Sequence, residues 1–166
     1  MASEDARARA RRRGPGKWGF LLAHHWSEQL DRCYLIWLGT HPVWLCARCT
    51  GVYPVLFLVL AAQIIHPLAL SNWDLLFLFV LPWPALIDWA LARLTRRPGS
   101  NRWRTITGVV LGISLGRMIY LHLVNPFQTL VILQLLLLSG IVGTVELLAI
   151  ILARQQKGAQ IRGRTE

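Results

Sequence analysis

Four long apolar runs occupy most of this 166-residue chain and leave few folds open to it. A helix needs about 20 residues to cross the ~30 Å hydrocarbon core of a bilayer, and each run meets that length. Overall, 54% of the residues are hydrophobic and only 16% are charged, which is more apolar surface than a soluble domain of this size could cover. The sequence therefore predicts an all-α, polytopic transmembrane bundle of four helices, at residues 52–70, 73–92, 105–124 and 128–153.

The basic residues indicate the direction of these helices. Of 18 Lys and Arg, all but Arg117 lie before the first run, around the loop between the second and third runs, or after the fourth. The loops near 66–72 and 125–127 contain none. Because Lys and Arg collect on the cytoplasmic side, we expect a multi-pass protein of the plasma membrane with both termini cytoplasmic. The charges flank the spans, so the expected partner is the lipid bilayer and no nucleic acid is expected.

The remaining segments differ in character from the spans. A short aromatic and aliphatic run at 34–38 cannot cross a membrane, and several tryptophans before the first span suit the half-wet interface. We expect an amphipathic helix on the inner surface, followed by a re-entrant or capping loop. The predicted units are a disordered basic tail at 1–17, the interfacial helix with a Cys/His motif at 18–50, the four-span domain at 51–153 and a basic cytoplasmic tail at 154–166.

All three cysteines and a histidine pair lie just before the first span. Cys46 and Cys49 have the spacing of a zinc-knuckle half-site, which a third thiolate or an imidazole can complete. The candidates for the remaining ligands are Cys33, His24, His25 and His41. Zinc is the favoured metal because sulfur and imidazole suit it, and iron and copper accept similar ligands.

The position of the cysteine pair allows thiol chemistry as an alternative. Thr50-Gly51 and Pro54 predict a helix that starts near residue 50, with the thiols over its amino end. The helix dipole and Arg48 would both favour thiolate there. A thiol- or quinone-linked oxidoreductase would use the same pair, but a standing disulfide is not expected in the reducing cytoplasm. Metal binding is therefore the leading interpretation, and inert cysteines are a third.

Three charged residues lie inside the predicted spans, where each costs at least ~2.5 kcal/mol and needs a partner. We expect Arg117 either to reach the outer surface or to pair with Glu146, which would orient the bundle. Asp88 is expected near the level of the cysteines, as a metal ligand, a general base or the partner of a loop arginine. The helix break at 82–84 predicts a polar pocket beside Asp88. A small transporter subunit, with these charges as its path, is a further alternative.

The third span contains a stripe of glycines spaced four apart, at Gly108, Gly112 and Gly116. Such a stripe lets another helix approach closely. Packing within the chain is the simpler interpretation, and a homo-oligomer through the same stripe is the alternative.

Two stretches resemble the domain-of-unknown-function family twenty eighty-five, which comprises multipass membrane proteins. They read Cys46-Ala-Arg-Cys49-Thr-Gly-Val-Tyr53-Pro54, and Leu86-Ile-Asp88-Trp followed by Asn101-Arg-Trp-Arg104-Thr-Ile-Thr107-Gly108. The resemblance covers about residues 24–116 and implies that the cysteines, Asp88, Asn101, Arg104 and Gly108 form one site. It names no reaction, so whether the protein is an enzyme stays open. In that site we expect Arg104 to bind an anionic lipid head group or small molecule, with Asp88 as the base.

Overall fold

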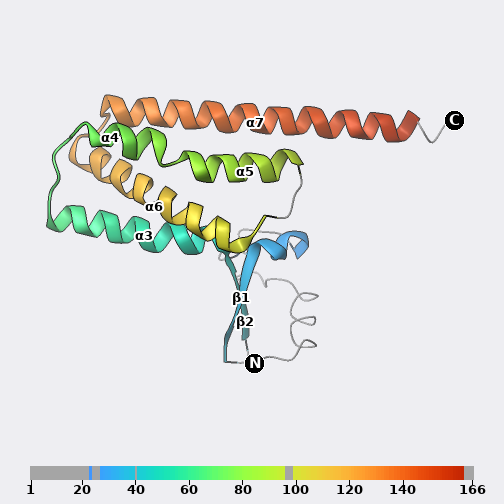
Figure 1. The fold of residues 1–166 in the computed structure, drawn as a ribbon, viewed down its shortest axis with the longest axis horizontal. Helices are drawn as coiled ribbons and strands as arrows, with labels where there is room; N and C mark the ends of the chain where they lie inside the picture. The colour runs from blue at the N-terminus through green and yellow to red at the C-terminus, as the bar shows by residue number, and fades with distance from the viewer. Residues whose placement is uncertain (1–22, 24–26, 40, 96–98, 163–166) are drawn as a thin grey trace.

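The computed structural model describes residue 23 and residues 27–39, 41–95 and 99–162. Within this part of the chain, four helical segments are long and apolar enough to cross a membrane, which confirms the predicted class (Figure 1). The second of them is interrupted, whereas the other three are continuous. The segments are α3 (Ala47–Ile65), then α4 (Trp73–Leu75) with the π-helical turn Leu76–Val80 and α5 (Trp83–Thr95), then α6 (Asn101–Val124), and finally α7 (Thr129–Arg162).

A β-hairpin precedes the first span, where the sequence predicted a re-entrant or capping loop. A short 3-10 helix, Ser27–Arg32, leads into β1 (Cys33–Leu38), which pairs antiparallel with β2 (His41–Cys46). Gly39 ends β1 with φ of +62°, a backbone conformation that favours glycine and reverses the chain. The aromatic and β-branched composition of both strands suits this pairing. The predicted interfacial helix falls mostly on residues 18–26, which lie outside the described residues except for residue 23.

The first span begins at Ala47, before the helix start predicted near residue 50 and before the predicted span at 52–70. Cys46 ends β2 with ψ of 124° and is the N-cap of α3, so the hairpin runs directly into the helix. Thr50 donates a hydrogen bond of 2.9 Å from Oγ1 to the Cys46 carbonyl, which supports the first turn. Pro54 consequently lies inside the helix instead of in its first turn.

The glycine stripe of the third span packs against α3 of the same chain. A Cβ on Gly108 would lie 2.5 Å from the Arg48 carbonyl oxygen, and one on Gly112 would lie 2.6 Å from that of Val52. Gly51 on α3 meets the α6 backbone in the same way, at the Thr105 carbonyl. The face formed by Gly108, Gly112 and Gly116 is therefore covered by α3 within the chain, which favours the packing interpretation of the stripe.

The second span bends, whereas the fourth is straight and lightly packed (Figure 1). In the bend, the Leu81 N–H donates to the Leu76 carbonyl, five residues back, immediately before Pro82. Proline has no N–H and clashes with the preceding turn, so a π-helical turn is a favourable way to approach it. The helix break predicted at this point is confirmed. Along α7, by contrast, the most apolar window has no buried residue.

Candidate functional site

The hairpin and the start of α3 bring the three cysteines to one place. The strand register sets Cys33 opposite Cys46, and Cys49 follows one helical turn later. The thiol of Cys49 is hydrogen-bonded to that of Cys46, and Cys33 is close enough for electrostatic interaction with Cys46. None of these three cysteines forms a disulfide. Strand pairing thus brings together Cys33 and Cys46, which are 13 residues apart in the sequence. The sequence did not predict this pairing.

Cys33 lies on the hairpin, outside the spans, and is buried. It is 6% exposed and packs with Leu30 and Trp44, while its Sγ donates to the Ala23 carbonyl at 3.7 Å. Burial, then the neighbouring Cys46 and Asp31, raise the pKa of Cys33 to about 11. The positive charge of Arg104 acts in the opposite direction. The thiol is therefore protonated at neutral pH, and a bound cation would have to displace its proton.

Arg48, between the two α3 cysteines, forms an ion pair with Asp88 of α5. The side chains are 23% and 9% exposed, so the pair is mostly enclosed. Of the alternatives predicted for Asp88, the structure favours the partner of an arginine near the loops. Because Arg48 stands between Cys46 and Cys49 in the sequence, this ion pair links the first turn of α3 to α5.

Asn101 and Thr105, in the first turns of α6, hold the hairpin against the bundle. The Asn101 side chain donates to the Asp31 carbonyl at 2.9 Å and to the Cys33 carbonyl at 3.4 Å. Thr105 Oγ1 lies 3.0 Å from the Tyr34 hydroxyl and donates to the Ala47 carbonyl at 2.9 Å. These contacts give the two polar side chains a structural role that spacing alone could not reveal.

Arg104 lies under the hairpin with only part of its hydrogen-bonding capacity used. The residue is 4% exposed, its Nη1 donates to the Asn101 side-chain oxygen at 3.2 Å, and its Nη2 has no acceptor. The indole nitrogens of Trp37 and Trp44 and the Nε of Arg48 are also buried without an acceptor. Four buried donors without an acceptor thus lie on the hairpin and on the two helix starts beside it.

The predicted metal ligands are brought only partly together. Among the described residues, no group of three or more His, Cys, Asp or Glu side chains is arranged to hold a metal ion. His24 and His25 lie outside the described residues. Ala23, which precedes them directly in the chain, is buried against Cys33. His41 is exposed at the far end of the hairpin, five register positions from the Cys33–Cys46 pair, so it is not near the thiols.

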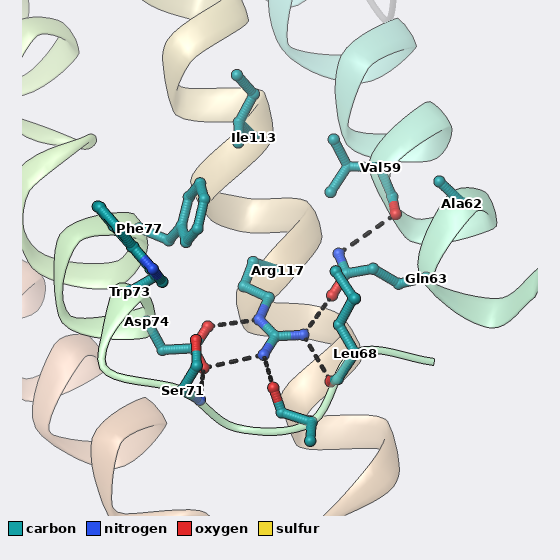
Figure 2. A pocket seen from close by; sticks show the side chains of 11 residues that line it. Val59, Ala62, Gln63, Leu68, Ser71, Trp73, Asp74, Phe77, Ile113 and Arg117 are labelled. Atoms are coloured by element: carbon teal, nitrogen blue, oxygen red, sulfur yellow. Dashed lines mark hydrogen bonds and ion pairs between the residues drawn. The ribbon is translucent and has the colours of Figure 1, made fainter. Parts of the chain in front are cut away.

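A second polar cluster surrounds Arg117 at the opposite end of α3 and α6 (Figure 2). The guanidinium is buried, forms an ion pair with Asp74 and donates a hydrogen bond of 2.7 Å to the Gln63 side-chain oxygen. Its remaining donors go to the carbonyl oxygens of Leu68 and Ala69 at 3.0 and 2.9 Å. The predicted pairing with Glu146 is wrong, since these neighbours already satisfy Arg117. The side chain does reach the loop at 66–72, but it stays buried there.

Glu146 pairs instead with Arg93, near the end of α5. The Nη2 of Arg93 lies 2.7 Å from a Glu146 carboxylate oxygen, and its Nε bonds to both oxygens at 3.0 and 3.1 Å. The side chains remain 48% and 38% exposed. The predicted path of Asp88, Arg117 and Glu146 is therefore not continuous, because each charge has a separate partner. The sequence analysis did not identify Asp74 as the partner of Arg117, although Asp74 lies at the start of the second span, level with the later part of α6.

Four apolar helices, with paired charges between them, define a polytopic membrane protein. The chain belongs to the family described as Predicted membrane protein (DUF2085), whose model matches residues 29–118. That range covers the hairpin, α3, α5 and most of α6, and so contains the whole cysteine and arginine cluster. No curated protein and no solved structure matches the chain significantly.

Proposed function

We propose that this membrane protein binds a metal ion, with zinc favoured, through Cys33, Cys46 and Cys49 at the junction of the hairpin and the first span. His24 or His25 would supply the fourth ligand. The observation that carries the proposal is the strand register, which aligns Cys33 with Cys46 while Cys49 contacts Cys46 from the first turn of α3. Three thiols and one imidazole make a common structural zinc site.

The surroundings of the thiols favour a negatively charged centre. Zinc with three thiolates carries one negative charge, and Arg104 is close enough to Cys33 to favour its thiolate. Buried N–H groups without acceptors, including Trp44 beside Cys33, could donate to thiolate sulfur. Binding would require Cys33 to give up its hydrogen bond to the Ala23 carbonyl. That carbonyl belongs to the peptide bond that leads into His24, so a ligand from the histidine pair needs little extra chain.

Elemental analysis of the full chain, purified in mild detergent, tests the proposal. We expect about one zinc per chain, lost in Cys46→Ser/Cys49→Ser and reduced in His24→Ala/His25→Ala. His122→Ala is the matched control, because His122 lies at the far end of α6 against Phe127 and should leave the zinc content unchanged. Metal retained by the double cysteine variant would refute the site.

Alkylation followed by mass spectrometry separates the metal site from the oxidoreductase alternative. A metal site predicts three thiols that are protected until a chelator is added. A reducible Cys46–Cys49 disulfide without stoichiometric metal would instead support thiol exchange and overturn the proposal.

A further inference from the structure

A cavity of about 670 Å³ lies between α5 and the first turn of α6. In Figure 1 these two helices separate toward the end of the bundle that carries the hairpin. The α5 wall is mainly apolar, with Ile87 and Leu91, while Gly99 and Trp103 form the opposite rim. Asp88 is its charged residue, and Arg48 already neutralises that carboxylate. The pocket predicted beside Asp88 therefore exists, but it is apolar over most of its wall.

The amino end of α6 faces this rim without a cap. Ser100 is the N-cap and forms no side-chain hydrogen bond, and the first turn contains no acidic residue. The first bond of the turn is from the Arg104 N–H to the Ser100 carbonyl, at 3.1 Å. The N–H groups of the preceding helical residues, including Trp103, therefore have no acceptor within the helix. A free helix amino end favours anions because its N–H groups and its dipole both point outward.

Arg104 adds a second, independent sign of a missing anion. The residue is only 4% exposed, yet its Nη2 atom has no hydrogen-bond acceptor. Gly99, which lines the cavity, adjoins the guanidinium, since a Cβ on Gly99 would lie 3.2 Å from Nη2. Arg104 does not itself line the cavity, and Gly99 is the residue that adjoins both. A buried guanidinium N–H without an acceptor is destabilising, so an acceptor is expected.

Arg104 and the charged residues around it include more arginines than aspartates, so one negative group would balance them. The residues that act on Arg104 are Arg32, Arg48, Asp31 and Asp88, so with Arg104 itself there are three arginines and two aspartates. Asp88 is engaged by Arg48, which removes it as a repulsive neighbour of an anion. We propose that the amino end of α6, with Arg104, binds a phosphate group carried by a lipid or by a soluble compound. Planar guanidinium donors and helix N–H groups are both suited to phosphate oxygens.

The apolar wall bears on the source of the phosphate. A cavity of about 670 Å³ is much larger than a phosphate ion, and Ile87 and Leu91 would contact hydrocarbon. A phospholipid would place its head group at Gly99 and an acyl chain along α5. The site does not depend on the metal proposal, because none of its contacts uses a cysteine.

Lipid retention and thermal unfolding of the purified full chain test this site. Native mass spectrometry compares phosphatidylglycerol with phosphatidylcholine, and thermal unfolding compares inorganic phosphate with chloride at equal ionic strength. We expect Arg104→Gln to weaken retention of phosphatidylglycerol at least about tenfold, since a charge-assisted hydrogen bond is lost. Arg102→Gln is the matched control, an exposed arginine two residues away that should change retention less than about twofold.

The two arms identify the source. Preference for phosphatidylglycerol with no effect of inorganic phosphate assigns a lipid, whereas stabilisation by inorganic phosphate without lipid preference assigns a soluble compound, and either supports the site. No effect in both arms, or equal losses in Arg102→Gln and Arg104→Gln, overturns it. Should Arg104→Gln fail to fold, Gly99→Ala decides, because its methyl group would crowd Nη2 and should weaken the same binding. Unchanged binding in Gly99→Ala would then count against the site.

Discussion

Arg117 illustrates how an arginine is accommodated inside an apolar bundle. A guanidinium has five N–H donors, and here all five have acceptors: two at Asp74, one at Gln63 and one each at the carbonyls of Leu68 and Ala69. Arg117 and Asp74 are 5% and 1% exposed. The cluster joins α3, the following loop, α4 and α6. Because no donor is left over, it acts as a structural clasp and offers nothing to a ligand.

Removing one charge of this clasp should be strongly destabilising. Arg117→Gln leaves the Asp74 carboxylate buried without its partner, a change that typically costs 3–5 kcal/mol, so we expect a loss of about that size. Arg117→Met/Asp74→Leu removes both charges and should recover much of the loss. Thermal unfolding in detergent measures both, with Arg154→Gln on the exposed end of α7 as a control near zero. Equal stability of Arg117→Gln and the control would show that the clasp contributes nothing.

The ion pairs also show the limit of reading depth from a sequence. Counting residues placed Asp88 near the level of the start of α3, where it pairs with Arg48, because the rise per residue is fixed in a helix. It could not choose the partner of Arg117, because choosing requires knowing which way each helix faces. The spans are apolar on every side, so little in them specifies rotation about the helix axis. Glu146 was therefore predicted as a partner of Arg117, whereas Asp74, which α4 places beside α6, was not considered.

At the scale of elements, the spans were predictable and the hairpin was not. Length and hydropathy are enough to define a span, and the helix break near Pro82 follows from proline chemistry. The strands are only six residues each and lie next to the first span, so their apolar residues look like interfacial structure. The usable signal was Gly39, which follows a run of aromatic and branched residues and precedes another such run. Without the hairpin, Cys33 could not be aligned with Cys46.

Close packing of α3 and α6 should make their glycines intolerant of any side chain. A Cβ on Gly112 would lie 2.6 Å from the Val52 carbonyl oxygen, so the helices must move apart and we expect Gly112→Ala to cost roughly 1–3 kcal/mol. Gly140 on α7 has nothing within 4 Å, and Gly140→Ala should be neutral or slightly stabilising because alanine favours helix. Thermal unfolding of the two variants measures the difference. A similar effect at both positions would point to helix propensity rather than packing.

For the whole molecule, the concentration of charge at one end organises both the site and the expected orientation. The starts of α3 and α6 lie near the hairpin, and the end of α5 points to the same end of the bundle (Figure 1). The arginines on these segments are Arg48, Arg93, Arg102 and Arg104. The family match ends at residue 118 and leaves α7 outside. The matched segment therefore contains the thiols, the uncapped helix and Arg104, while α7 adds a fourth crossing and the Arg93–Glu146 pair.

Reporter fusions test the expected orientation, with both termini in the cytoplasm. A fluorescent protein fused after Glu166 should fluoresce, and alkaline phosphatase at the same position should be inactive. Alkaline phosphatase inserted in the loop at 66–72, which has no Lys or Arg, should be active. The physical reason is that the basic loops resist translocation, so the thiols and the amino end of α6 would face a reducing compartment. Active phosphatase at the carboxyl terminus would reverse the topology, expose the cysteines to oxidising conditions and favour a disulfide over a metal.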